Sequence, residues 1–490
     1  MTDTNLSYIN SLPNEVLARI FSTLTNRRQR LRELPSPALL SSVCHHWRML
    51  AQNTPELWVN IMVPFNKSPE DSRTWTAEWI ARSGVLLISV TINSAMRNDL
   101  DSLIMPYFTN TMDLLSQHSE RLRRLALFTD HNIIIADAFA QLRSAPNLQH
   151  LTIWIDTAST SWMEPQDHTQ RQYSVDFPRL AILKALGGVI PLVSSLTSLT
   201  IYYPPARYEF MSRIFTTSPC LKHLTLHLIQ MRVNPFVQPG PLIRADSLRS
   251  LALTVSSLHL PRLDGLPALK YLAMPNIKYL ELDGEDWNIS DFGQSLSSAQ
   301  IDTLRILNRS EKSYDADVVD FLHSFSTVRH LQLIHASTRL LSNSVPSLVH
   351  KSSIHTNFHD QSPSQPPDMP LTNIDIITRS QPEQSVPPNV WPKLRKITLD
   401  TSSAGDVLNL CEFVASHKHV EVVELSTSAR RHLSSSLRRK GDNIYQRLSL
   451  DEAAGSEEGL NDVEEWLSKM VKIRTTSVRG RSSLAILYTI

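Results

Sequence analysis

A short leucine motif, LxxLxL, recurs through most of this 490-residue chain and constrains its fold more than any other feature. Leucine, isoleucine or valine fills its three apolar positions, and the copies are mostly about 21 to 29 residues apart. A unit of this length buries its apolar side chains only by stacking on its neighbours. The copies are Leu122-Leu125-Leu127, Leu148-Leu151-Ile153, Leu196-Leu199-Ile201, Leu221-Leu224-Leu226, Leu248-Leu251-Leu253, Ile277-Leu280-Leu282, Val328-Leu331-Leu333, Leu371-Ile374-Ile376, Leu394-Ile397-Leu399 and Val420-Val423-Leu425, with degraded copies at Leu180-Leu183 and Leu304-Leu307 and a crowded one at Leu269-Leu272-Met274.

Helical patterns fill the spaces between the copies. Apolar residues recur at helical spacing over 137–143, 209–215, 316–325 and 406–416, while 86–92 alternates like a strand after a helical stretch at 75–82. Strand and helix therefore alternate. The period and this alternation predict an α/β fold, a curved leucine-rich-repeat-like solenoid with parallel strands on its concave face and helices outside. We place the solenoid at 75–336 and its last repeats at 370–428.

A doubly wound α/β enzyme also alternates strand and helix. Its strands are buried on both faces and read as continuous apolar runs. Here polar residues fill the alternate positions of the predicted strands, as a sheet with one exposed face requires. The solenoid is therefore the favoured fold, although its repeats lack the regular asparagine of the most regular leucine-rich repeats.

The C-terminal third contains segments that break the repeat pattern. Residues 337–369 are rich in Ser, Pro, Gln and Asn, a composition typical of a disordered insertion. Residues 429–459 form a charged linker, with a basic cluster at 430–447 followed by an acidic run at 451–465. Such a cluster can be a nucleic-acid or nuclear-import patch, but neighbouring opposite charges more often neutralise one another. We expect 460–490 to cap the array with a helix at 460–473 and a strand at 484–490.

The N-terminal stretch 9–61 reads as two or three short amphipathic helices. Ser11 is the expected N-cap, Pro13 stands in the first turn, and a Thr54-Pro55 break precedes the last turn. So much apolar surface cannot be buried within about fifty residues alone. It must pack on the rest of the chain, on a partner, or on both. The signature residues are Leu12-Pro13, Glu15-Val16-Leu17, Ile20-Phe21, Val43-Cys44, Trp47-Arg48 and Pro55-Glu56-Leu57-Trp58.

These residues stand in the order and approximate spacing of an F-box, and the chain resembles the fungal F-box proteins that carry a leucine-rich-repeat-like body. The spacer 25–37 is longer and more basic than the short link of a compact F-box. The resemblance implies a helical module that binds a Skp adaptor, and through it a cullin and a ubiquitin-transfer machine. The adaptor contacts it implies are Leu12, Pro13, Val16, Leu17, Ile20, Phe21, Val43 and Trp47.

The sequence offers little for catalysis or cofactor binding. Neither a phosphate-binding glycine loop nor a nucleophile elbow is present. The histidines and carboxylates show no metal-ligand spacing and no nucleophile–base pair, so we expect no enzyme activity, no cofactor and no metal. Three widely spaced cysteines fit a reducing compartment, the cytoplasm or the nucleus. A net charge of +1 gives no global argument for nucleic acid, and no apolar run is long enough to span a membrane.

A binding surface follows from strand geometry, because residues that alternate with the leucines must line the concave face. Large aromatic side chains and Arg are frequent anchors of protein interfaces, and an acidic middle section would suit a basic partner. The alternative is that Trp154 and Tyr202 only cover apolar edges between repeats. The residues predicted to bind a protein substrate are Arg124, Phe128, His150, Trp154, Tyr202, His223, His227, Tyr279, Glu281 and Asp283.

The combined prediction is a non-enzymatic substrate receptor of a Skp-cullin-F-box ubiquitin ligase. Its F-box would bind the adaptor, and its solenoid would hold a protein substrate. Two alternatives remain at the level of the sequence. One is an F-box scaffold that works without the ligase, and the other is a nuclear nucleic-acid binder that uses the basic cluster at 430–447.

Overall fold

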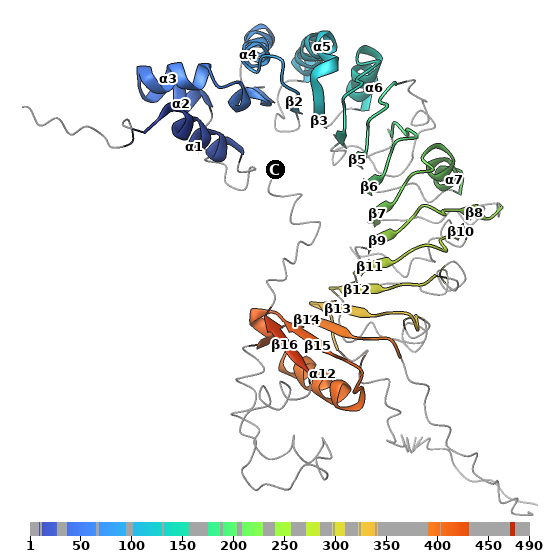
Figure 1. Cartoon of the computed structure of the whole chain (residues 1–490). Coiled ribbons are helices and arrows are strands. Elements are labelled where there is room, and N and C mark those ends of the chain that lie inside the picture. Colours follow the sequence, from blue (N-terminus) through green and yellow to red (C-terminus); the bar gives the residue numbers. More distant parts are fainter. Residues whose placement is uncertain are drawn as a thin grey trace, which may run out of the picture.

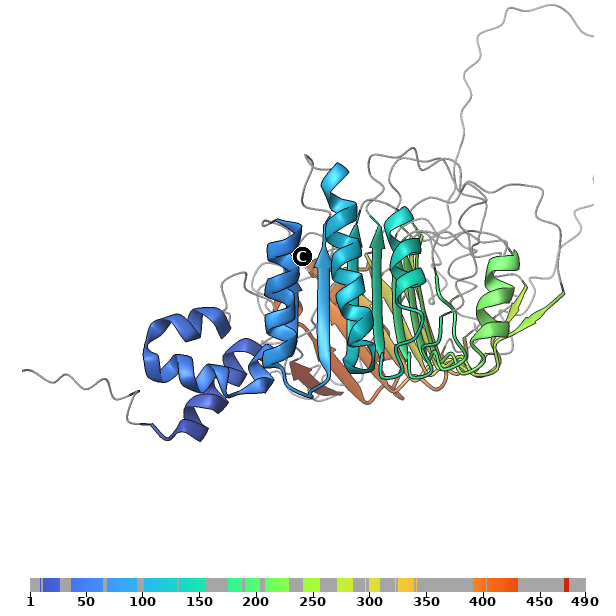
Figure 2. The same cartoon turned by 90° about the horizontal axis from the view of Figure 1, so that it is seen from above.

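The structure is a computed structural model in which parallel strands line the inside of an open arc and helices cover its outside (Figure 1). A helical unit stands at the N-terminal end of the arc (Figures 1 and 2). The residues that the structure describes are 9, 12–26, 37–64, 68–94, 101–129, 132–155, 175–186, 190–202, 208–228, 241–255, 271–284, 296, 299–308, 322, 325–338, 341, 391–401, 403–430 and 471–475.

One sheet of fourteen strands runs the length of the arc, and every neighbouring pair in it is parallel. Its strands lie in chain order from first to last, whereas a doubly wound sheet reverses its order at a switch point. The solenoid prediction is therefore confirmed. The strands are β1 (Asn60–Val63), β2 (Ile88–Asn93), β3 (Leu122–Thr129), β4 (His150–Ile155), β5 (Ile182–Leu186), β6 (Ser198–Tyr202), β7 (His223–Leu228), β9 (Ser250–Val255), β11 (Tyr279–Asp283), β12 (Thr303–Leu307), β13 (His330–Ile334), β14 (Lys396–Asp400), β15 (Val422–Leu425) and β16 (Lys472–Thr475).

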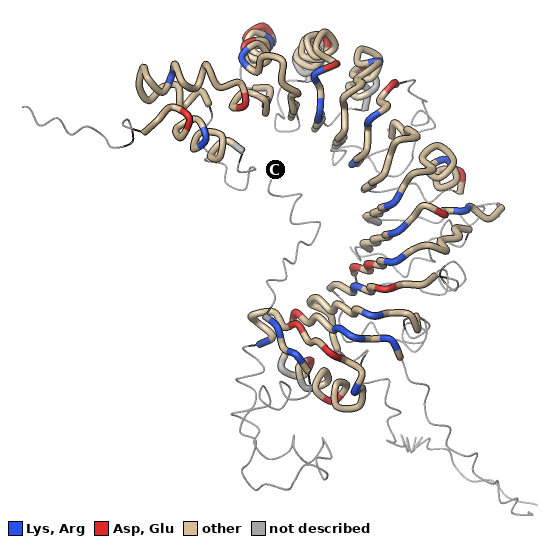
Figure 3. The backbone as a smooth tube through the Cα atoms, viewed as in Figure 1, with Lys and Arg blue, Asp and Glu red and all other residues tan. Residues whose placement is uncertain are grey.

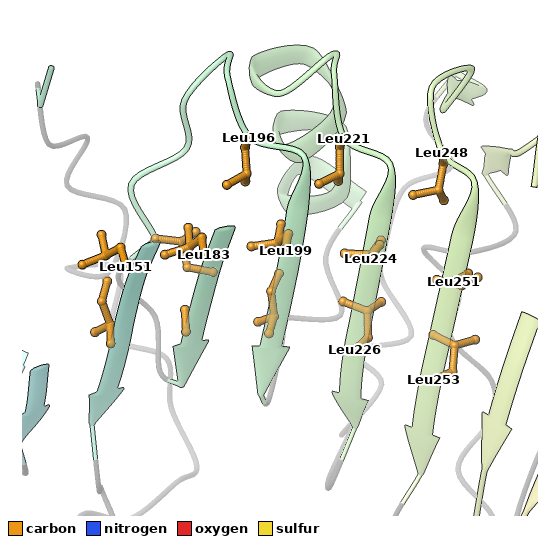
Figure 4. Packing of buried hydrophobic residues seen from close by; sticks show 14 of the residues in the cluster. Leu151, Leu183, Leu196, Leu199, Leu221, Leu224, Leu226, Leu248, Leu251 and Leu253 are labelled. Atoms are coloured by element: carbon orange, nitrogen blue, oxygen red, sulfur yellow. The ribbon is translucent and has the colours of Figure 1, made fainter. Parts of the chain in front are cut away.

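The leucines of the motif form columns that run from strand to strand through the core (Figure 4). Leu151, Leu183, Leu199, Leu224 and Leu251 are in register on successive strands, and each is fully buried. Burying one such side chain contributes about 1.5–3 kcal/mol. Because each repeat covers the leucines of the next, the stack has one continuous core.

The solenoid helices that the structure describes lie on the outer side of the sheet, where they cover the leucine columns (Figure 2). In α4, Ser68 caps the helix by accepting a hydrogen bond from the Asp71 amide at 3.1 Å, and Pro69 occupies the first turn. The helix predicted at 75–82 is thus confirmed and begins earlier. These helices are α4 (Pro69–Arg82), α5 (Asp101–Gln117), α6 (Asn132–Gln141), α7 (Tyr208–Thr217) and α12 (Ala404–Ser416), with a short turn η3 (Ser119–Arg121) before β3.

A ladder of side-chain hydrogen bonds joins successive repeats at the residue before the first apolar position of the motif. Asn, Ser or Thr stands there, and its side chain donates to a backbone carbonyl of the preceding repeat. This mixed ladder replaces the regular asparagine that the sequence lacks, because it satisfies backbone carbonyls between repeats. Its bonds are Asn147 to Glu120 O (2.7 Å), Ser195 to Leu180 O (2.9 Å), Ser247 to Leu221 O (2.9 Å), Asn276 to Asp246 O (2.8 Å) and Thr327 to Ile301 O (2.9 Å).

The structure corrects the register of one repeat and resolves the crowded pair. Leu304 is in register with Leu280 and Leu331, so that repeat reads Ile301-Leu304-Ile306 rather than beginning at Leu304. Leu272 lies in β10 (Leu272–Ala273), which pairs only with β8 (Ile243–Arg244) in a separate two-stranded sheet on the outer side (Figure 1). The degraded copy at Leu183 is in contrast a full member of the main sheet.

Both ends of the array differ from the prediction. The sheet begins with β1, before the predicted start at 75, because 60–63 pairs with β2. At the other end the strand β16 contains Ile473, where we expected a helix. The predicted insertion also begins later than 337, since Thr338 is buried and its amide donates to the Asp406 carboxylate of α12 at 2.7 Å. The predictions for 342–390, 431–470 and 476–490 lie outside the described residues, and with them the copy at 371–376 and the expected strand at 484–490; of the helix predicted at 316–325, only residues 322 and 325 are described.

The helical unit consists of α1 (Asn14–Asn26), α2 (Pro37–Val43), α3 (His45–Gln52) and the short turn η2 (Pro55–Trp58), which leads directly into β1. Cys44 caps α3, because its sulfur accepts a hydrogen bond from the Trp47 amide at 3.4 Å. The expected N-cap Ser11 lies outside the described residues.

Candidate functional site: two protein-interaction surfaces

The helical unit is built around the apolar stripe of α1. Leu17 and Phe21 point inward and are fully buried, and the Phe21 ring packs on Trp47 of α3 with centroids 4.8 Å apart. Leu40 of α2 is buried as well. The stripe therefore holds the three helices together, and the helices carry the outward-facing residues of the unit.

Trp58 joins the helical unit to the solenoid. Its ring is fully buried, and its indole N–H donates to the Ala51 carbonyl of α3 at 2.8 Å. Trp79 of α4 packs edge-on against it at 4.9 Å, and the Arg82 guanidinium lies 4.6 Å from the centre of the ring. The core of the unit is thus continuous with that of the repeats. The helical unit is fixed to the first strand rather than tethered by a linker.

The predicted adaptor residues divide into buried and exposed groups. Leu17 and Phe21 were predicted to contact the adaptor. In this chain both are buried and pack inside the unit, and their contact with an adaptor stays a prediction. Val16 and Val43 are exposed by 43% and 58%, and Pro13 is exposed too. Leu12, Ile20 and Trp47 are half-buried.

Other exposed apolar side chains in the unit were not predicted. Leu39 is exposed by 57% and Met49 by 46%. Leu39 lies one helical turn before Val43, so the i, i+4 spacing places both on one face of α2 and could have identified it. Most of the large apolar side chains that are exposed in the described part of the chain belong to 9–62: Ile9, Val16, Leu39, Val43, Met49 and Met62.

The second surface is the concave face of the sheet, whose side chains form four rows across the strands. The rim row precedes the strands and is linked by backbone hydrogen bonds: Arg123, Gln149, Ala181, Thr197, Lys222, Arg249, Lys278, Asp302, Arg329, Arg395 and Glu421. The first, second and third rows are the outward positions along each strand, beginning on β3 with Arg124, Ala126 and Phe128.

The strand registers place all ten predicted substrate-binding residues in these rows. The first row contains Arg124, His150, His223 and Tyr279, the second row contains Glu281, and the third row contains Phe128, Trp154, Tyr202, His227 and Asp283. His223 is exposed, and most of the others are half-buried.

Three members of the third row differ from the prediction of an exposed face. Phe128, His227 and Asp283 are buried, with at most 9% of their surface accessible. His227 is buried because the Tyr202 ring on the neighbouring strand covers it. Strands lie only about 4.8 Å apart, so large side chains in one row cover one another. From β3 to β7 the third row is therefore packed and mostly apolar, and its Trp154 and Tyr202 remain half-exposed.

Aromatic rings are stacked within the third row. The Tyr202 ring lies 4.3 Å from the His227 ring at an interplanar angle of 9°, and Trp154 lies 5.2 Å from Tyr202. Burial, and secondarily the Lys184 charge, lowers the pKa of His227 to about 4, so this imidazole is neutral at physiological pH. Burial also raises the pKa of Tyr202.

The middle of the face is not the free acidic patch that the sequence predicted. Glu281 forms an ion pair of 3.1 Å with Arg305 of β12 and accepts a hydrogen bond from the Tyr279 hydroxyl. Burial, together with the Glu281 charge, raises the pKa of Tyr279. Asp283 accepts from the Asn308 side chain at 2.7 Å. The prediction missed Arg305 because its repeat was read in the wrong register.

The C-terminal strands carry a further polar network. The Lys396 ammonium lies 2.8 Å from the Glu424 carboxylate, which also accepts from Thr398 at 3.1 Å. The His330 imidazole lies 2.8 Å from the same Thr398 hydroxyl. Burial, and secondarily the Lys396 charge, lowers the pKa of His330 to about 4. In this part of the face, the Lys396 and Glu424 charges therefore offset each other.

Metal-ligand clusters and membrane-spanning helices are absent from the described residues. They contain no group of three or more His, Cys, Asp or Glu that could hold a metal ion. Cys411 is buried, and burial raises the pKa of its thiol to about 12, which makes it unreactive. Over the same described ranges, no helix combines the length and apolarity needed to cross a membrane. Both candidate surfaces are suited to binding a protein.

Comparison with known protein families finds a match over the helical unit. Residues 9–63 match the F-box-like family, which confirms the predicted unit at 9–61 to within two residues at its C-terminal end. No curated protein matches the chain. Among solved structures the chain is similar to the "Crystal structure of TLR13-ssRNA13 complex", with 12% identity and a TM-score of 0.26. That similarity covers 63% of this chain but only 38% of the other. The chain thus combines an F-box-like unit with a leucine-rich-repeat-like solenoid.

Proposed function

We propose that this chain is the substrate-recognition subunit of a Skp-cullin-F-box type ubiquitin ligase. The F-box-like match at 9–63 carries the proposal, because F-box domains generally bind Skp-type adaptors. In this role the helical unit binds the adaptor, and through it a cullin, while the concave face holds a protein substrate.

The exposed side chains of the helical unit support adaptor binding. Val16 on α1, Leu39 and Val43 on α2 and Met49 on α3 all stand in solvent. Apolar side chains gathered on one end of a protein mark an interaction site more often than scattered ones do. Leu17, Phe21 and Trp47 support that surface from beneath by fixing the helices that carry it.

The junction at Trp58 supports a receptor role. Because Trp58 and Trp79 join the helical unit to the solenoid in one core, a substrate on the concave face is held at a fixed place relative to the adaptor. Holding two reactants close together raises their effective concentration. The chain therefore contributes proximity, and the ligase machinery makes the bond.

Co-purification with a Skp-type adaptor tests the proposal. The test variant carries Val16→Glu and Val43→Lys, two exposed positions where each new charge suits its end of a helix. The matched control is Val85→Lys, which is 92% exposed in the turn between α4 and β2. Parent and control should bind the adaptor, and the test variant should lose it while keeping the parent's melting temperature.

Other outcomes point elsewhere. If the parent chain does not bind the adaptor, the proposed function is wrong. If it binds the adaptor but no substrate becomes ubiquitinated in its presence, the chain is the ligase-independent scaffold instead. The nucleic-acid alternative rests on 430–447, of which only Arg430 is described.

A further inference from the structure

The concave face changes its charge character between β9 and β11. On the six strands from β3 to β9 the rim row and the three outward rows contain no Asp or Glu. The same positions contain Lys and Arg from four of these strands. They are Arg123, Arg124, Lys184, Lys222 and Arg249.

The strands from β11 to β16 carry both signs of charge in the same rows, and most of the acidic residues there form ion pairs. From β11 onward acidic residues join the basic ones along the strands (Figure 3). Their ion pairs are Arg305–Glu281 (3.1 Å), Lys396–Glu424 (2.8 Å), Arg395–Glu421 (3.2 Å) and Lys278–Asp302 (3.9 Å). From β3 to β9 these rows therefore contain basic residues and no acidic ones, which gives this half of the face a net positive charge.

Two lysines of this half are available to a partner. Lys184 stands in the second row of β5 and Lys222 in the rim row before β7, and both are exposed. Within the described residues neither forms an ion pair or a side-chain hydrogen bond, so a ligand carboxylate displaces no internal partner from them. Arg124 extends the positive side toward β3.

The opposite end of these strands, at the third row, is apolar. The half-exposed Trp154 and Tyr202 lie in the third row, four residues along the strand from the first row. Four residues of strand span about 13 Å, and β3 to β9 covers five strand spacings, or about 24 Å. The surface thus accommodates about seven residues of extended chain lying across the strands.

We propose that the β3–β9 half of the concave face binds an extended acidic segment of a protein partner. The segment alternates Asp or Glu with large apolar residues, because successive side chains of an extended chain point to opposite sides. Its carboxylates lie toward Lys184 and Lys222, and its apolar side chains pack on Trp154 and Tyr202. The inference rests on the proposed function in so far as this segment belongs to the ligase substrate.

The geometry favours this occupant over others of the same charge. The positive charges are spread over about 24 Å, which suits several single carboxylates rather than one compact dianion. Nucleic acid bases would need free ring faces on which to stack. Tyr202 and His227 instead use their faces against each other.

Fluorescence anisotropy on the full-length protein tests the inference with a labelled peptide in which glutamate and phenylalanine alternate. The test variant carries Lys184→Glu and Lys222→Glu. The matched control carries Arg329→Glu and Lys472→Glu, which make the same charge change at exposed positions on the strands from β11 to β16, where acidic residues stand in the same rows. We expect the test variant to bind at least about tenfold more weakly and the control to stay within about twofold of the parent.

Further arms separate charge from sequence. A peptide with lysine in place of glutamate should not bind, and raised salt should weaken the parent's binding. Equal losses in test and control variants, equal binding of the lysine peptide, or tighter binding of a single-stranded oligonucleotide of the same net charge would each overturn the inference. Adaptor co-purification on the same protein keeps the two proposals apart. A chain that binds adaptor but not peptide contradicts this inference alone, and one that binds peptide but not adaptor contradicts only the proposed function.

Discussion

Replacing His227 by Phe should remove a pH-dependent loss of stability. His227 is buried against Tyr202, and burial together with Lys184 lowers the pKa of its imidazole from 6.5 to about 4. In the unfolded chain the imidazole takes up a proton below its ordinary pKa, whereas in the folded protein it stays neutral until about pH 4. Stability contributed by the neutral ring is therefore present above pH 6.5 and is lost as the pH falls toward 4.

The size of the effect follows from the two pKa values. Between pH 7.5 and pH 5 the difference in proton binding weakens the folded state by about 2 kcal/mol. In a chain of this length that corresponds to about 2 °C in melting temperature. Phe keeps a flat ring against Tyr202 but does not titrate. The His227→Phe variant should therefore gain about 2 °C relative to the parent as the pH is lowered from 7.5 to 5.

Thermal unfolding at the two pH values measures this difference. His223, which is exposed on the same strand, provides the matched control, because its ring is in water in both the folded and unfolded states. His223→Phe should follow the parent at both pH values. A His227→Phe variant with the parent's pH dependence would refute the claim that the third row is packed.

The remaining predictions concern packing and paired charges. Arg305→Met should cost about 2 kcal/mol, because it leaves the Glu281 carboxylate only 18% exposed and without its cation, and adding Glu281→Gln should restore most of that loss in thermal unfolding. Ser247→Ala should cost about 1 kcal/mol by removing one rung of the inter-repeat ladder, again read as a melting temperature. Trp58→Ala should cost about 3–5 kcal/mol, and limited proteolysis should then cut between the helical unit and Trp79.

The repeats were predictable because their signal is carried by buried leucines at a fixed spacing. Leu151, Leu199 and Leu224 identify strands without any knowledge of tertiary contacts, and their registers follow from the motif. The motif does not determine the register where neighbouring apolar residues allow two frames. In Leu304–Leu307 the correct frame depends on Ile301, which only pairing with the neighbouring strands can show.

The site was predictable only as far as strand alternation goes. Alternation correctly placed Trp154, Tyr202 and Glu281 on the concave face. It could not show that His227 is covered by Tyr202 or that Glu281 is paired with Arg305, because both depend on which strand lies next to which. The net positive charge of the rows from β3 to β9 was not predicted either.

The helical unit shows a similar division. A 3.6-residue period identified the stripe containing Leu17 and Phe21, but both sides of an interface use apolar residues. Sequence alone could not separate the side chains that hold the unit together from Val16 and Val43, which face outward.

Simultaneous binding of the adaptor and the acidic peptide to one chain tests the receptor account most directly. The helical unit and the β3–β9 half lie on different parts of the arc, joined through Trp58 (Figure 1). The account predicts that a chain saturated with adaptor binds the glutamate–phenylalanine peptide with an affinity within about twofold of the free chain. Mutual exclusion of adaptor and peptide would contradict it, because a receptor must hold both at once.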